Sequence, residues 1–133
     1  MKVEPYLHFG GRCEEAIEFY KQAVGAEVTV KMRFKDCPDK SMIQPGVEEK
    51  IMHANMRIGD STVMISDGRC QGSAAFEGFS LTVTVKNDAE AEKAFKALSD
   101  GGAVTMPLAK TFFSSKFGML KDRFGVSWTL LVG

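Results

Sequence analysis

Apolar and polar positions follow the same order twice along the chain, so the sequence predicts one structural unit that occurs twice. Apolar residues recur at helical spacing from Cys13 to Val24, before Gly25, and a second helical pattern runs from Asp88 to Leu98. One strand-like segment precedes each helix and three follow it. The expected strands cover residues 3–9, 27–34, 51–58 and 62–66 in the first half, and 79–85, 103–106, 117–121 and 126–132 in the second.

This order of elements predicts an α+β fold made of two βαβββ modules. Each module is expected to form a curved antiparallel sheet with its helix outside. A chain of 133 residues is long enough for one domain. We therefore expect a single domain over residues 1–133, with module 1 at 1–68, a linker at 69–76 and module 2 at 77–133. Pro107 is expected to end the strand 103–106.

Side chains alternate between the two faces of a strand, which gives most of the predicted strands one apolar and one polar face. His53 and Asn55 share the polar face of one strand, as Ser80 and Thr82 do on another. Trp128 lies on an apolar face and is predicted to be buried against a helix. We expect the polar faces to line a concave cavity. A solvated outer face would give the same pattern, so that alternative stays open.

Charge and composition narrow the classes of partner. The 17 Lys and Arg residues balance the 17 Asp and Glu residues, and this lack of a basic excess argues against a nucleic-acid partner. No segment approaches about 18 continuous apolar residues, so no membrane partner is expected. The cysteines, Cys13, Cys37 and Cys70, are odd in number and widely spaced. They are expected to be free thiols in a cytoplasmic protein.

Few residues suggest covalent or cofactor chemistry. His8 is expected to be a packed core histidine, and His53 either contacts a ligand together with Asn55 or is structural. Gly10-Gly11 precedes a helix but lacks the pattern of a nucleotide-binding turn. No nucleophile–base arrangement is suggested locally, so no cofactor is expected and the catalytic residues stay unknown.

Five segments spread along the chain together form a recognisable set. They are Pro5-Tyr6-Leu7-His8-Phe9, Glu14-Glu15-Ala16-Ile17-Glu18-Phe19-Tyr20 with Gly25-Ala26, His53-Ala54, Met64-Ile65-Ser66-Asp67 and Asp122-Arg123-Phe124-Gly125-Val126-Ser127-Trp128. This set resembles the vicinal oxygen chelate superfamily, which includes glyoxalase I, extradiol dioxygenases and bleomycin or fosfomycin resistance proteins. The similarity is greatest to its PhnB-like branch, often labelled demethylubiquinone methyltransferase-like. The resemblance implies a glyoxalase-like fold and a dimer.

The resemblance also implies where a metal would be bound. The metal enzymes of the superfamily carry ligands on the first, fourth, fifth and eighth strands. The matching positions here are Pro5, Met64, Ser80 and Thr129. None of these residues is a good ligand for a hard divalent cation, which prefers carboxylates and imidazoles. We therefore expect no metal site.

The leading hypothesis is a small-molecule-binding protein of this superfamily without a catalytic metal, similar to its antibiotic-sequestering, bleomycin resistance-like members. A metal-dependent lyase, isomerase or dioxygenase is the alternative. A metal-free enzyme that uses His53 or Asp67 as general acid or base is a third possibility. The expected ligand contacts are His53, Asn55, Met64, Ser66, Ser80, Thr82, Thr129, Phe112 and Phe117, with Phe113 and the irregular segment 35–49 as further walls.

The expected assembly is a homodimer with two equivalent pockets, each partly closed by the partner or by segment 35–49. The eight methionines, including Met42, would suit an adaptable interface. Symmetric dimers are also the commonest soluble homo-oligomers. A monomer whose two modules close on each other is the alternative.

Overall fold

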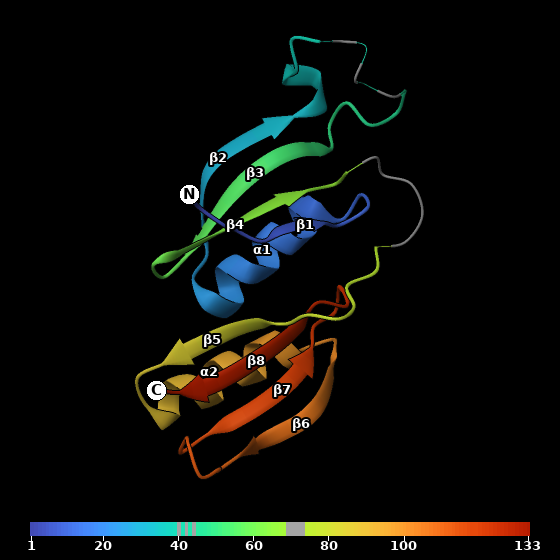
Figure 1. Cartoon of the computed structure of the whole chain (residues 1–133). Coiled ribbons are helices and arrows are strands. Elements are labelled where there is room, and N and C mark those ends of the chain that lie inside the picture. The colour runs from blue at the N-terminus through green and yellow to red at the C-terminus, as the bar shows by residue number, and fades with distance from the viewer. Residues whose placement is uncertain (40, 42, 44, 69–73) are drawn as a thin grey trace. The chain divides into compact units, whose positions relative to one another are not determined.

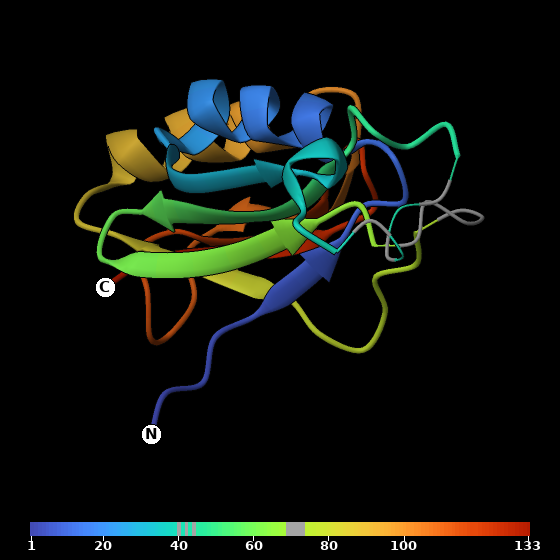
Figure 2. The same cartoon turned by 90° about the horizontal axis from the view of Figure 1, so that it is seen from above.

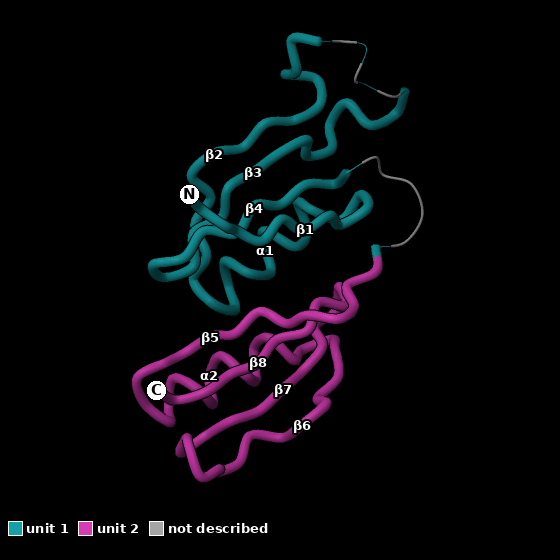
Figure 3. Tube along the Cα trace, viewed as in Figure 1, with its two compact units in different colours: residues 1–74 teal, residues 75–133 magenta. Residues whose placement is uncertain are grey.

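A computed structural model of the chain describes residues 1–39, 41, 43, 45–68 and 74–133. The chain divides into two compact units, Met1–Ala74 and Ala75–Gly133, and the boundary falls within the predicted linker (Figure 3). Each unit contains a four-stranded sheet and one α-helix (Figure 1). The predicted α+β fold of two βαβββ modules is therefore confirmed. Met42 and Cys70 lie outside the described residues.

The first unit is a mixed sheet with strand order β1-β4-β3-β2. β1 runs parallel to β4, whereas β4–β3 and β3–β2 are antiparallel pairs. The prediction of a fully antiparallel sheet was wrong for this one pair. The helix carries the chain from β1 to the far edge, and two reversals then bring β4 back beside β1 in the same direction. The elements are β1 (Tyr6–His8), α1 (Cys13–Val24), β2 (Glu27–Arg33), a 3-10 turn (Phe34–Asp36), β3 (Ile51–Ile58) and β4 (Ser61–Ser66).

The second unit repeats this topology with strand order β5-β8-β7-β6, and again the pair β5–β8 is parallel. The expected end of a strand at Pro107 was wrong, because β6 continues to Ala109. β6 is an edge strand, where a missing N–H can be tolerated, and its pairing with β7 is irregular between Met106 and Ala109. The elements are β5 (Leu81–Val85), α2 (Asp88–Ser99), β6 (Ala103–Ala109), β7 (Phe117–Lys121) and β8 (Ser127–Val132).

The apolar stripe of α1 explains which face of the first sheet is covered. Ala16, Ile17 and Tyr20 lie on one side of the helix and are buried. Figure 2 shows α1 lying along one face of its sheet. The helix ends at Gly25, whose φ of 67° is left-handed and whose N–H donates to the carbonyl of Tyr20. The opposite face of this sheet has no helix among the described residues.

The second helix is capped and packed in a similar way. The Asn87 side chain accepts a hydrogen bond from Glu90 N at 2.9 Å, which satisfies a free amide at the start of α2. Phe95 is buried beneath the helix. A Cβ at Gly118 of β7 would lie 2.9 Å from Phe95 Cε2, so a glycine here permits the close approach of helix and sheet. None of the described helices is long and apolar enough to cross a membrane.

Trp128 anchors the core of the second unit, as predicted. It is 1% exposed, and its indole Nε1 donates to Asp122 Oδ2 at 2.8 Å. The other carboxylate oxygen of Asp122 accepts from Phe124 N at 2.9 Å and Val126 N at 3.0 Å. One carboxylate therefore joins the β7–β8 turn to the buried indole.

Replacing Trp128 by alanine is expected to lower the free energy of unfolding by about 3–5 kcal/mol, because it leaves a cavity and removes one donor to Asp122. Urea unfolding followed by circular dichroism measures the change. The matched control is Phe112→Ala, because Phe112 is 100% exposed and contributes no core packing. Equal stability of Trp128→Ala and the wild-type protein would contradict the assignment of this face to the core.

Candidate functional site

The sheet faces opposite the helices carry most of the predicted site residues. We call the face of the first sheet opposite α1 open face 1, and the face of the second sheet opposite α2 open face 2. Strand register places Tyr6, Met64, Asn55 and Val30 side by side in one row of open face 1. Four predicted contacts, His53, Asn55, Met64 and Ser66, therefore lie on one face of one unit.

A chain of two hydrogen bonds crosses open face 1. Tyr6 Oη lies 2.7 Å from His53 Nδ1, and His53 Nε2 lies 2.8 Å from Asn55 Oδ1. Because an amide oxygen only accepts, Nε2 carries a proton, and in the neutral imidazole Nδ1 accepts from the Tyr6 hydroxyl. Partial burial is the largest cause that raises the pKa of Tyr6, so the phenol keeps its proton at neutral pH. Sequence reasoning missed Tyr6, whose partner lies 47 residues away.

His8 lies on the same face, and its expected burial in the core was wrong. The side chain is exposed, and its ring stacks on Tyr6 with centroids 4.8 Å apart and planes 15° apart. Alternation along the short edge strand explains this, because Leu7 and Phe9 take the buried positions on either side of it. A Cβ at Gly68, where φ is +61°, would lie 3.3 Å from His8 Nδ1. Glycine therefore suits both the turn and its aromatic neighbour.

Ser66 supports open face 1 from within the sheet. It is 3% exposed. Its hydroxyl donates to the carbonyl of Met52 at 2.8 Å and accepts from Gly68 N at 2.8 Å. The first bond ties the end of β4 to Met52 of β3, and the second holds the backbone of the turn that follows β4. The main contribution of this hydroxyl in the described structure is therefore to the shape of the turn beside His8.

The Asp67 side chain accepts three hydrogen bonds from backbone amides of the first unit. The residue is 1% exposed. Its Oδ1 accepts from Gly11 N at 2.9 Å and Cys13 N at 2.7 Å, and its Oδ2 accepts from Ile51 N at 2.9 Å. The carboxylate thus occupies the amino end of α1, where a negative charge is favoured, and links it to β3. This geometry gives Asp67 a structural role and argues against its use as a general base.

The predicted contacts of the second module gather on open face 2. Ser80 Oγ lies 3.1 Å from Thr129 Oγ1, and Thr82 pairs with Thr129 in the register of β5 and β8. Thr129 is 7% exposed and pairs on its other side with Met119. This part of the face offers hydroxyls and a thioether. Sequence alternation predicted its hydroxyl residues correctly as neighbours on one face.

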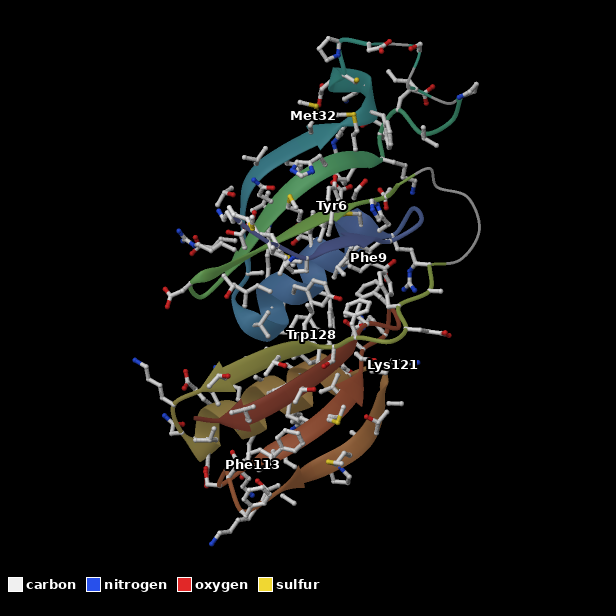
Figure 4. All side chains as sticks on the ribbon, in the orientation of Figure 1. Tyr6, Phe9, Met32, Phe113, Lys121 and Trp128 are labelled. Atoms are coloured by element: carbon white, nitrogen blue, oxygen red, sulfur yellow. The ribbon has the colours of Figure 1, made fainter. Side chains whose placement is uncertain are left out.

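An aromatic series leads away from open face 2. Phe117 is half-buried and pairs with Leu131 of β8. Phe113, labelled in Figure 4, packs edge-on against Phe117. The two ring centroids are 5.1 Å apart, and Phe112 packs against Phe113 at the same distance. Phe117 therefore belongs to the sheet, whereas Phe112, which is 100% exposed, lies in the preceding loop.

The four positions that the resemblance assigns to metal ligands form two close pairs. The carbonyl of Pro5 accepts a hydrogen bond from Met64 N at 2.9 Å, and Ser80 contacts Thr129 as described above. Their side chains offer one thioether and two hydroxyls, a donor set that does not fit a hard divalent cation. Within the described residues, no group of three or more His, Cys, Asp or Glu could hold a metal ion.

Comparison with known proteins identifies the family. The model of the 3-demethylubiquinone-9 3-methyltransferase family matches residues 1–131. Protein YjdN of Escherichia coli strain K12 is 34% identical over 142 residues, which cover 99% of this chain and 95% of that protein. A PhnB protein from Bacillus cereus is 31% identical, with a TM-score of 0.83 and coverage of 100% of both chains.

A third comparison connects the fold to a wider group. A glyoxalase-related enzyme from Fulvimarina pelagi has a TM-score of 0.67 and covers 100% of this chain and 88% of its own, at 15% identity. At this identity the likeness concerns the fold alone. The chain belongs to the 3-demethylubiquinone-9 3-methyltransferase family, in its PhnB-like branch, and its fold is glyoxalase-like.

Replacing Asp67 by asparagine is expected to lower the free energy of unfolding by about 1–3 kcal/mol, because an amide nitrogen would replace one of the two accepting oxygens. Urea unfolding measures the loss. The matched control is Asp60→Asn, an exposed carboxylate in the β3–β4 hairpin. If both variants unfold at the same urea concentration, the three hydrogen bonds of Asp67 contribute nothing net to stability.

Proposed function

We propose that this protein binds a small molecule without a catalytic metal, and that the hydrogen-bonded chain Tyr6–His53–Asn55 on open face 1 forms the polar centre of the site. That chain is the observation on which the proposal rests. Small-molecule sites are largely apolar surfaces with a few polar groups held in fixed positions. Here two side-chain hydrogen bonds fix the three polar groups before any ligand arrives.

The surroundings of the chain support a binding role. Val30 is 48% exposed, and Met32 and Met64 are half-buried on the same face. These apolar side chains can exclude water from a ligand that hydrogen-bonds to the polar centre. The proposed contacts in the first unit are His53, Asn55, Met64 and Ser66. Those proposed in the second unit, taken by itself, are Ser80, Thr82, Thr129, Phe112 and Phe117.

The chemistry of the site supports binding over two catalytic alternatives. The family description names a methyltransferase, but the amides of Gly11 and Cys13 at the start of α1, where an anionic cofactor group could bind, already hold Asp67. A metal-dependent lyase, isomerase or dioxygenase is the runner-up. The residues Pro5, Met64, Ser80 and Thr129 argue against such an enzyme, because they offer neither a carboxylate nor an imidazole to a divalent cation.

We further propose a cytoplasmic homodimer. Cys37 is a free thiol, which suits a reducing compartment. Val104 and Met106 are 47% and 46% exposed on the edge strand β6, and apolar edges of this kind are commonly covered by another surface. Light scattering at micromolar protein concentration distinguishes the dimer from a monomer.

Removing the polar centre is expected to weaken ligand binding. A thermal-shift screen against metabolites and antibiotics identifies ligands, and calorimetry with the best ligand then measures affinity. Asn55→Ala should weaken binding by about tenfold, the equivalent of one well-placed hydrogen bond. Asp60→Ala, in the hairpin at the end of β3, is the control. Equal affinities of Asn55→Ala and wild type would remove Asn55 from the site.

Divalent metal ions are expected to leave the melting temperature unchanged. A true site at an ion concentration of one hundred times its Kd would stabilise the fold by about 2.7 kcal/mol. Zn²⁺, Mn²⁺, Ni²⁺ and Mg²⁺ are tested separately on chelator-treated protein. A saturable rise in melting temperature that a chelator reverses would favour the metal-dependent enzyme instead.

A further inference from the structure

The two hydrogen bonds of the Tyr6–His53–Asn55 chain are compatible with two protonation states of His53. When the imidazole is neutral, Tyr6 O–H donates to Nδ1 and Nε2–H donates to Asn55 Oδ1, over 2.7 and 2.8 Å. When the imidazole is protonated, both nitrogens donate. Nε2–H keeps its bond to Asn55, whereas Nδ1–H now donates to the Tyr6 oxygen. Neither heavy-atom contact has to break.

The change of state reverses what Tyr6 presents to its surroundings. When His53 is neutral, the Tyr6 hydroxyl donates a hydrogen bond to Nδ1, so the phenol oxygen can only accept a hydrogen bond from a ligand. When His53 is protonated, the phenol oxygen accepts a hydrogen bond from Nδ1–H. The Tyr6 hydroxyl then keeps its proton and can donate it in a hydrogen bond to a ligand. Tyr6 is 41% exposed, so a ligand can reach this oxygen. Burial raises the pKa of the Tyr6 phenol above its ordinary value, so the hydroxyl is protonated at neutral pH.

The face around Tyr6 is aromatic and apolar. Tyr6 stacks on His8 at 4.8 Å and meets the ring of His53 edge-on, with centroids 5.4 Å apart. Met64 is its neighbour on β4, and Met32 is the register partner of His53 on β2 (Figure 4). Flat aromatic and polarisable thioether groups favour a planar aromatic ligand.

The charged groups that flank the face along its strands are neutralised by partners. Arg57, two residues after Asn55 on β3, pairs with Glu27, and Glu4, two residues before Tyr6, pairs with Lys2. His53 contacts Tyr6 of β1 and Asn55 of its own strand, and its register partner is Met32 of β2. Tyr6 in turn stacks on His8. His8 is therefore the second imidazole on this face. An uncharged ligand matches this environment.

We infer that open face 1 binds a planar, uncharged aromatic ligand, and that His53 sets the hydrogen-bond polarity of the site through Tyr6. The neutral site selects a ligand that donates a hydrogen bond to the Tyr6 oxygen. The protonated site selects a ligand that accepts one from it. This inference rests on the proposed binding function and adds the ligand class and the specificity-determining group.

The test uses two uncharged aromatic probes of similar size, indole as a donor and 1-indanone as an acceptor, with 1-methylindole as a ring that lacks the donor. The titration of His53 is first measured from its ring C–H resonances in the full chain. Affinities are then measured by NMR titration at one pH unit below and above that midpoint. The ratio of indole to 1-indanone affinity should rise about fivefold or more as pH increases, as expected for one exchanged hydrogen bond.

Variants separate this mechanism from other causes of a pH dependence. Tyr6→Phe keeps the ring but removes the oxygen, and His53→Gln removes the titration. Either change should make the affinity ratio independent of pH. His8→Phe keeps a stacked ring and removes the other imidazole, and there the rise should persist. Loss of the rise in His8→Phe, with retention in His53→Gln, would overturn the assignment to His53.

The outcomes also separate this inference from the proposed function. If the probes shift the resonances of Tyr6 and His53 but the affinity ratio is constant with pH, the inference is wrong and binding at open face 1 stands. If the probes leave those resonances unmoved while another metabolite shifts them, the ligand class is wrong. If no compound in the wider screen binds either open face, the proposed function fails as well.

Discussion

The buried carboxylate of Asp67 is the interaction on which open face 1 depends. β1 is an edge strand of three residues, too short to hold a precise position through its ladder alone. Asp67 binds the amides of Gly11 and Cys13, just beyond β1, and the amide of Ile51 at the start of β3. It therefore fixes β1 and β3 in one frame. The 2.7 Å contact between Tyr6 on β1 and His53 on β3 follows from that frame.

Asp122 gives the second unit a comparable anchor at a different place in the module. It follows the third strand of its module, whereas Asp67 follows the fourth. Each carboxylate accepts three N–H donors, and in both cases the hydrogen bonds compensate the cost of removing a charge from water. Both carboxylates therefore fix a turn through hydrogen bonds that they accept. The donors of Asp67 are all backbone amides, whereas one donor of Asp122 is the Trp128 side chain.

The sequence predicted those features that depend on local periodicity. The bounds of α1, β3 and β7 and the burial of Trp128 agree with the pattern of apolar positions. Features set by partners distant in the chain could not be obtained this way. His8 has the local surroundings of a core residue, and only its position in an edge strand shows that it faces outward. Tyr6 and Asp67 gain their roles from residues about fifty positions away, for which single-sequence patterns hold no information.

The two open faces differ in the chemistry of their side chains although the fold of the two units is the same. Helix packing constrains the covered face of each sheet, whereas the open face is free of that demand. Strand register within the first sheet forms the row Tyr6–Met64–Asn55–Val30. Register within the second sheet forms the row Thr82–Thr129–Met119–Met106 at the matching positions of the repeated topology. The next row pairs His53 with Met32 in the first unit and Phe117 with Ala109 in the second.

In these aligned rows, open face 1 contains the imidazoles and the phenol, whereas open face 2 contains hydroxyl, thioether and phenyl groups. None of those groups on open face 2 titrates near neutral pH. A dependence of ligand choice on pH must then arise on open face 1. Because both contacts of His53 are compatible with either protonation state, protonation reverses the hydrogen bond between Tyr6 and His53. The bond from His53 to Asn55 and the arrangement of the strands stay as they are.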